Sequence, residues 1–119
     1  MSGDHVFHAE DVDVDVGQVR EKHAAGEIQL IDVREPHEWE AGRIEGARHV
    51  ELERVASEAE SIDRERPVVF YCRLGARSGM AANAFRRAGY DAYSMVGGIT
   101  DWDERGMPLE PADGHVADH

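Results

Sequence analysis

The stretch that decides the fold is Pro67-Val-Val-Phe-Tyr-Cys-Arg-Leu-Gly-Ala-Arg-Ser-Gly79. It opens with Val68–Tyr71, a β-branched and aromatic run bounded by turn residues, which is typical of a buried strand. Apolar residues at helical spacing follow, and they are Met80, Ala81, Ala84, Phe85 and Ala88. The pattern predicts a strand, a six-residue loop from Cys72 to Arg77, and a helix that begins near Ser78.

The same alternation of strands and helices extends to both sides of this stretch. Residues Val12–Val16 alternate at period two and indicate a short edge strand, and Asp15 is placed to cap a helix through Ala25. Further strands are predicted at 28–33, 47–50 and 92–96, and further helices at 36–41, 52–62 and 99–105. This alternation is typical of an α/β domain with a mostly parallel sheet covered by helices on both faces. Ligand sites of such sheets lie at the carboxyl ends of the strands, where Cys72 is expected.

Length and composition indicate one globular domain, because the 119 residues are 41% hydrophobic and 32% charged. We expect the domain to span residues 12–110, between flexible polar ends at 1–11 and 111–119. No apolar run approaches the ~20 residues that cross a bilayer. The acidic N-terminus lacks the basic and apolar pattern of a signal peptide, so a cytoplasmic location is expected.

The net charge of −12 is the most unusual feature of the composition. A surface this acidic argues against binding nucleic acids or anionic membranes, because both need a basic footprint. Lys22 is the only lysine, and an acid excess with little lysine suits a protein made in high salt. Residues 67–90 are the exception, since they hold four arginines and no acid. The sequence therefore predicts a small cationic pocket in an acidic protein.

Cys72 is the only cysteine, so neither an internal disulfide nor a cysteine-based zinc site is available. It precedes a helix whose free N–H groups and partial positive charge stabilise an anion. Gly75 permits a curled loop that aims N–H groups at one point, and Arg73 and Arg77 add two permanent charges. A thiolate at Cys72 would be stabilised there as a nucleophile. The alternative, a buried core cysteine, fits the flanking Arg and Gly less well.

Four motifs resemble, in the same order, those of the rhodanese-like (sulfurtransferase) domain family. They are Leu30-Ile-Asp-Val-Arg-Glu35 followed by Glu38-Trp39, Ala41-Gly-Arg-Ile-Glu-Gly-Ala47, the loop Cys72-Arg-Leu-Gly-Ala-Arg-Ser78, and Val96-Gly-Gly-Ile-Thr-Asp-Trp102 with Gly106-Met-Pro108. Arg43 departs from the His that is common in the second motif. The resemblance covers residues 12–110 and implies a five-stranded, mostly parallel sheet flanked by helices.

The resemblance also implies a sulfurtransferase reaction in two steps. The Cys72 thiolate would take the sulfane sulfur of a donor such as thiosulfate, and an acceptor such as cyanide or a thiol would then remove it. No metal or organic cofactor is implied. The implied anion-binding loop consists of Arg73, Leu74, Gly75, Ala76, Arg77 and Ser78. Both loop arginines would bind the donor's oxygens, which favours doubly anionic thiosulfate over mercaptopyruvate.

Two other functions stay open. The first is a persulfide carrier or partner-binding module that works with a sulfur-relay protein and turns over little alone. The second is a phosphatase or arsenate reductase, which the loop length disfavours. Cysteine phosphatases need C-x5-R to surround a phosphate, whereas Cys72 and Arg77 are spaced C-x4-R.

The remaining candidates have supporting roles. Asp32 ends a strand at the same sheet edge and is interpreted either as holding Arg34 or an active-loop group in place, or as an ordinary strand-end carboxylate. Arg34 either lines the pocket or pairs with Glu35 or Glu38. The seven histidines are scattered, so we predict no metal site, and His49 is a weaker candidate for approaching the pocket.

Overall fold

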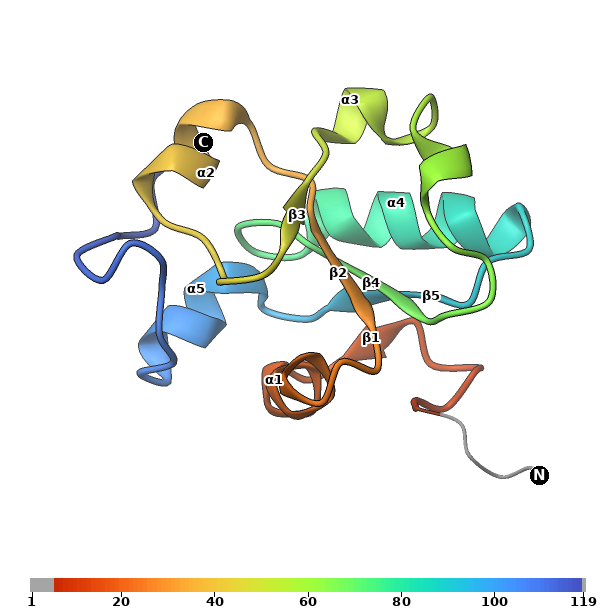
Figure 1. The fold of residues 1–119 in the computed structure, drawn as a ribbon, viewed down its shortest axis with the longest axis horizontal. Helices are drawn as coiled ribbons and strands as arrows, with labels where there is room; N and C mark the ends of the chain where they lie inside the picture. The colour runs from red at the N-terminus through yellow and green to blue at the C-terminus, as the bar shows by residue number, and fades with distance from the viewer. Residues whose placement is uncertain (1–5, 119) are drawn as a thin grey trace.

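One sheet of five parallel strands organises the protein, which a computed structural model describes over residues 6–118 (Figure 1). The strands are β1 (Asp13–Val14), β2 (Gln29–Asp32), β3 (Arg48–His49), β4 (Val68–Tyr71) and β5 (Ala92–Met95). Their order across the sheet is β1-β5-β4-β2-β3, and all four neighbouring pairs are parallel. The five-stranded α/β fold predicted from the sequence is confirmed.

Helices cover both faces of the sheet. They are α1 (Val16–Ala24), α2 (Pro36–Ala41), α3 (Leu52–Val55), α4 (Ala76–Arg87) and α5 (Gly98–Glu104), together with a 3-10 turn at Ala59–Ser61. In Figure 1, α3 and α4 lie on one side of the sheet, α1 lies on the other, and α2 stands at one end of the molecule. Within residues 6–118, no helix has the length and apolar character needed to cross a bilayer.

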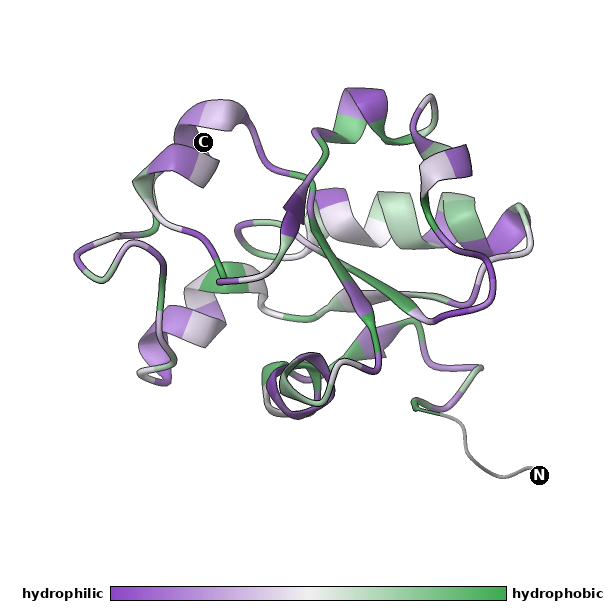
Figure 2. Cartoon of the chain, in the orientation of Figure 1, coloured by the Kyte–Doolittle hydropathy of each residue, from purple (hydrophilic) through white to green (hydrophobic). Residues whose placement is uncertain are grey.

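The central strand β4 divides the interior into two apolar clusters. Val69 and Tyr71 pack on one face with the buried residues of α1 and α5, whereas Val68 and Phe70 pack on the other with α3 and α4. Successive side chains of a strand point to opposite faces, so a strand buried on both must be apolar throughout. Figure 2 shows the hydrophobic colour following β2 and β4 and hydrophilic residues on the outer segments. This central position places Cys72 at the middle of the sheet edge.

Two helix predictions need correction. The helix predicted over 52–62 is instead the single turn α3 followed by the 3-10 turn. The Ser57 hydroxyl donates to the Arg54 carbonyl oxygen and the Ser61 hydroxyl to that of Glu58, both at three residues' separation. Such local hydrogen bonds compete with those of a continuous α-helix.

The buried face and the start of α4 also differ from the prediction. The buried residues are Ser78, Ala81, Ala82 and Phe85, whereas Met80, Ala84 and Ala88 are exposed. Small side chains on this face let the helix lie close to the sheet. The helix begins at Ala76, two residues earlier than expected. The loop after β4 is therefore only four residues long, and Arg77 lies in the first helical turn.

Part of the N-terminal segment 6–11, which the sequence predicts to be flexible, contacts the domain: Phe7 is buried, whereas residues 8–11 are exposed. Phe7 is 4% exposed and its ring centroid lies 4.7 Å from that of Tyr93. Arg86 donates to the carbonyl oxygens of Ala9 and Asp11. The contact with the Tyr93 ring buries the Phe7 side chain, although the rest of the segment is mostly polar. Residues 1–5 of the expected flexible end lie outside the described residues.

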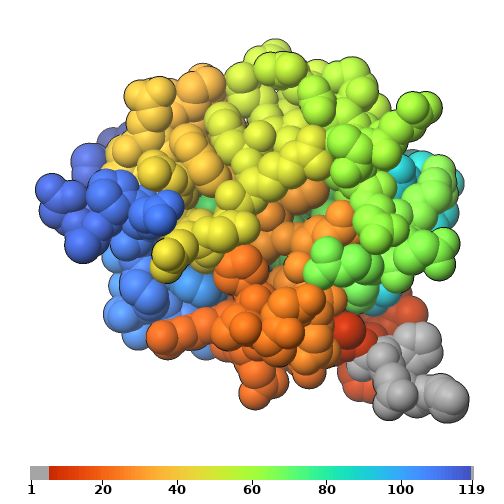
Figure 3. Space-filling model, viewed as in Figure 1, coloured from red at the N-terminus to blue at the C-terminus, as the bar shows by residue number. Residues whose placement is uncertain are grey.

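Part of the C-terminal segment 111–118, which the sequence predicts to be flexible, contacts the domain, although most of these residues are exposed. The His115 N–H donates to the Ala41 carbonyl oxygen at 2.9 Å, and Val116 packs against the α1 and α5 cluster. Just before them, Arg43 and Glu110 pair through their backbones. Figure 3 shows this segment lying against the part of the chain around α2. The end of the chain thereby returns to the sheet edge that carries Cys72.

Candidate active site

Cys72 follows β4 directly and lies at the carboxyl edge of the sheet. Its carbonyl oxygen accepts from the Ile99 N–H at 2.9 Å, and that of Arg73 accepts from the Thr100 N–H at 3.1 Å. A Cβ atom at Gly98 would collide with both carbonyl groups. The first turn of α5 therefore fixes the carbonyl groups of Cys72 and Arg73.

The Cys72 sulfur accepts hydrogen bonds from the loop and from the start of α4. The Gly75 N–H lies 3.0 Å from Sγ and the Ser78 N–H 3.4 Å. The Ser78 hydroxyl lies 3.5 Å from Sγ and 2.7 Å from the hydroxyl of Ser94 on β5. Gly75 adopts φ +127°, a conformation that other residues rarely reach. Converging backbone donors at a helix N-terminus are an arrangement that can stabilise an anion.

Cys72 is in no disulfide and opens onto a small cavity. The residue is only 1% exposed. The cavity has a volume of about 140 Å³ and is lined by Cys72, Arg73, Leu74, Ala76 and Arg77. The structure thus brings together around one small space the thiol and most of the loop residues proposed from the sequence. Gly75 and Ser78 contribute through their N–H groups on the sulfur.

Arg77 forms an ion pair with Glu38 of α2. Its two terminal nitrogens donate to the two carboxylate oxygens at 2.8 and 3.1 Å, and the Glu38 side chain is fully buried. The Glu35 N–H also donates to Glu38, at 3.0 Å. The hydrogen bond to Glu38 raises the pKa of Arg77. Burial alone would raise the pKa of Glu38, but the hydrogen bonds from Arg77 and the Glu35 N–H outweigh it and the pKa is lowered.

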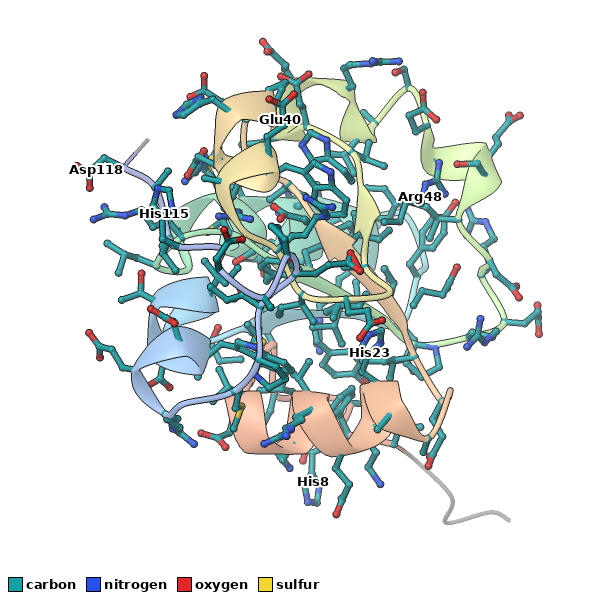
Figure 4. All side chains as sticks on the ribbon, turned by 60° about the vertical axis from the view of Figure 1, so that its left-hand side comes forward. His8, His23, Glu40, Arg48, His115 and Asp118 are labelled. Atoms are coloured by element: carbon teal, nitrogen blue, oxygen red, sulfur yellow. The ribbon has the colours of Figure 1, made fainter. Side chains whose placement is uncertain are left out.

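Arg73 meets a different carboxylate. It pairs with Asp118 at 3.1 Å, and the Asp118 side chain is 93% exposed. Nε2 of His37 on α2 lies 3.0 Å from the Asp118 carbonyl oxygen, which ties the end of the chain to α2. Figure 4 shows Asp118 and His115 on the segment that carries the chain back to this region. Both loop arginines thus pair with acids from distant segments. A count of acids within residues 67–90 does not include these partners.

Asp32 and Arg34 form a closed ion pair rather than part of the cavity. Both side chains are fully buried, with Arg34 Nη2 2.7 Å from Asp32 Oδ2. Arg34 also donates to the Gly42 carbonyl oxygen at 2.8 Å. Burial lowers the pKa of Arg34, but the hydrogen bonds to Asp32 outweigh it and raise the pKa overall. Asp32 therefore holds Arg34, as one interpretation expects, and the partner of Arg34 is Asp32 rather than Glu35 or Glu38.

Among residues 6–118, no histidine lines the thiol cavity. His49 stacks on Trp39 with ring centroids 5.0 Å apart, and its Nε2 lies 2.7 Å from the Arg34 carbonyl oxygen. These contacts brace the loop after β2. Over residues 6–118, the His, Cys, Asp and Glu side chains form no group of three or more that could hold a metal ion. His5 and His119 lie outside that range.

The fold and the site define a class: a parallel α/β domain that presents one free cysteine to backbone donors at a helix N-terminus. The model of the rhodanese-like domain matches residues 15–105. The chain belongs to this family. Among solved structures, a rhodanese-related protein from Thermoplasma volcanium aligns with a TM-score of 0.76 and 24% identity, over 82% of this chain and 95% of that one.

Curated relatives share more sequence. The chain is 43% identical over 75 residues to the uncharacterized protein YqhL of Bacillus subtilis, covering 62% of this chain and 60% of YqhL. It is 36% identical over 88 residues to the thiosulfate sulfurtransferase GlpE of Pseudomonas aeruginosa, covering 73% of this chain and 76% of GlpE. Some other curated relatives are matched over only 21% to 40% of their own length.

Proposed function

We propose that the protein is a sulfurtransferase in which Cys72 carries the transferred sulfur. The single observation that carries the proposal is the pair of backbone N–H groups, from Gly75 and Ser78, that point at Sγ. These donors are part of the fixed backbone at the start of α4, so they need no rearrangement when the sulfur becomes anionic. Relatives named sulfurtransferases support the proposal.

The proposed reaction transfers one sulfur atom in two displacements. The Cys72 thiolate attacks the outer sulfur of thiosulfate, a new S–S bond forms, and the old S–S bond breaks as sulfite leaves with its electron pair. Cyanide or a thiolate then attacks the terminal sulfur of the Cys72 persulfide and releases the thiolate. The reaction needs no further oxidant, reductant or cofactor. The proposed donor is a small anion because the cavity is small and Arg73 lines it.

A second candidate is a persulfide carrier that passes sulfur to a protein partner. The observation that favours it is the exposure of Leu74, which lines the cavity, and of Met80, which lies one helical turn after the lining residue Ala76; they are 56% and 64% exposed. Apolar side chains left exposed around a reactive group are typical of interaction surfaces. Either function suits the cytoplasm, which we propose as the location because thiols stay reduced there.

Thiocyanate formation from thiosulfate and cyanide tests the enzymatic proposal. We expect turnover by the native protein and none by Cys72→Ser, which keeps the size of the side chain. Sulfur uptake without thiocyanate turnover would favour the carrier instead. Equal thiocyanate formation by both proteins would contradict a role for Cys72.

A further inference from the structure

The two arginines near the thiol differ in how firmly they are held. The guanidinium of Arg77 is bound through two nitrogens to Glu38, whose side chain is fully buried. Arg73 pairs with Asp118, whose carboxylate is almost fully in water. An exposed pair is easily exchanged for another anion, whereas leaving a buried carboxylate without its partner is costly. Asp118 can therefore give way to a substrate anion, but Glu38 cannot.

Glu38 lies close enough to matter for chemistry at the thiol. Arg77 lines the cavity together with Cys72, and both of its terminal nitrogens are bound to the carboxylate of Glu38. Because Arg77 is ion-paired with Glu38, the negative charge of the carboxylate offsets the positive charge of the guanidinium. The loop therefore attracts anions less strongly than its two arginines suggest, and the loss is greatest for a doubly charged donor.

Apolar side chains near the cavity point independently to an organic group on the donor. Among residues 6–118, three large hydrophobic side chains are exposed: Leu74, Met80 and Val96. Leu74 lines the cavity, and Met80 follows the lining residue Ala76 by one helical turn. Val96 follows β5 and precedes Gly97, whose backbone nitrogen lies beside Gly75 of the loop. Inorganic thiosulfate has no apolar surface to place against these residues.

We propose that Glu38 is a positioning residue that holds Arg77 and so biases Cys72 toward organic sulfane-sulfur donors with one negative charge, over dianionic thiosulfate. The proposal rests on the proposed sulfurtransferase function. In the step concerned, an S–S bond forms between Cys72 and the sulfane sulfur. The donor's own bond to that sulfur breaks, and its organic part leaves with the electron pair as a thiolate or sulfinate. The products balance without a further reagent.

A matched pair of donors tests the proposal. Methanethiosulfonate differs from thiosulfate by a methyl group in place of one charged oxygen, so each variant is judged by its kcat/KM for both donors. Because a Coulomb energy scales with the donor's charge, Glu38→Gln should raise kcat/KM about ninefold for thiosulfate and about threefold for methanethiosulfonate. Glutamine keeps the acceptor oxygen for Arg77, and thermal unfolding checks that the variant is folded.

Two further variants separate positioning from a general charge effect. Glu40 is exposed on the same helix (Figure 4), so Glu40→Gln removes the same charge and should leave the ratio of the two kcat/KM values unchanged. In the double variant Glu38→Gln/Arg77→Gln, the gain for thiosulfate should vanish and the native ratio should return within about twofold, because the freed arginine is gone. This variant also serves if Glu38→Gln alone does not fold.

Each outcome decides the proposal. Equal changes for both donors in Glu38→Gln, or a gain that survives in the double variant, would overturn the role of Glu38 while leaving the sulfurtransferase function intact. The ratio of kcat/KM for thiosulfate to kcat/KM for methanethiosulfonate could also be lower in the double variant than in the native protein. That result would mean that Arg77 already binds thiosulfate, and it would overturn the proposal as well. If native Cys72 takes sulfur from neither donor, the proposed function itself is wrong.

Discussion

Two loops leave the carboxyl edge of the sheet side by side, and they differ in which groups their charged side chains contact. After β2, Asp32 and Arg34 close on each other with both side chains fully buried. After β4, the Cys72 sulfur is met by backbone N–H groups, and Arg73 and Arg77 line a cavity beside it. In the first loop the ion pair forms between two side chains of the loop itself. In the second loop the arginines pair with acids of other segments, and the backbone N–H groups remain directed at the sulfur, where they can stabilise an anion. The same edge thus supports one structural and one reactive loop.

The largest expected effect comes from breaking the closed pair. Arg34→Met leaves Asp32 buried and uncompensated, so the free energy of unfolding should fall by about 3–5 kcal/mol. Denaturant titration measures the change. Cys72→Ser in the other loop should alter the free energy of unfolding by less than about 1 kcal/mol, because serine keeps the size of the side chain and its oxygen can still accept from the Gly75 and Ser78 N–H groups. Similar losses in both variants would erase the distinction between the loops.

A smaller effect is expected at the bend of the reactive loop. Gly75→Ala places a side chain at φ +127°, which should cost about 1–3 kcal/mol of stability. Relaxing that strain moves the Gly75 N–H away from Sγ, so the rate of sulfur uptake should also fall. Gly106→Ala, at φ +76° with open space around it, is the control for glycine strain away from the thiol. A rate that falls equally in both variants would contradict the role of the Gly75 N–H.

Acid should weaken the link between α2 and the reactive loop. The pKa of Glu38 in the folded protein lies below its ordinary value of 4.5, so the unfolded chain binds this proton more readily. The stability contributed by Glu38 is complete above pH 4.5 and is lost as the pH falls through the lower folded value. The free energy of unfolding should therefore fall less steeply below pH 4.5 in Glu38→Gln than in the native protein. Parallel curves would mean that Arg77 does not stabilise the Glu38 carboxylate.

The smallest effect is expected at the exposed pair. Asp118→Asn should change the free energy of unfolding by no more than about 0.5 kcal/mol, because the Asp118 side chain is in water. It should raise the affinity for thiosulfate at low salt by removing a competing anion from Arg73, and the difference should shrink as salt is added. Titration of the Cys72→Ser protein with thiosulfate measures this without turnover. A salt-independent difference would point to a change in structure rather than charge.

The fold and the thiol's position could be predicted from the sequence because they depend on local patterns. The run Val68–Tyr71 is apolar at every residue, and Cys72 follows it directly. The partners of the arginines could not be predicted in this way, because Glu38 and Arg77 lie 39 residues apart and Arg73 and Asp118 lie 45 apart. Charges counted along a segment therefore overstated the positive charge of the pocket.

Individual contacts near the two chain ends could not be predicted for a related reason. Phe7 is a lone aromatic residue in a polar segment, and only the tertiary fold brings Tyr93 against it. His115 docks through its backbone N–H on Ala41, a contact that carries no side-chain signature. The single-turn helix α3 likewise reflects local serine hydrogen bonds that compete with an apolar helical period.

Intact mass spectrometry tests the central claim most directly. The protein is incubated with methanethiosulfonate or thiosulfate, freed of donor, measured, and measured again after addition of cyanide. The account predicts a gain of one sulfur atom, located on Cys72, that cyanide removes and that Cys72→Ser never shows. A folded native protein whose mass does not change with either donor would contradict it.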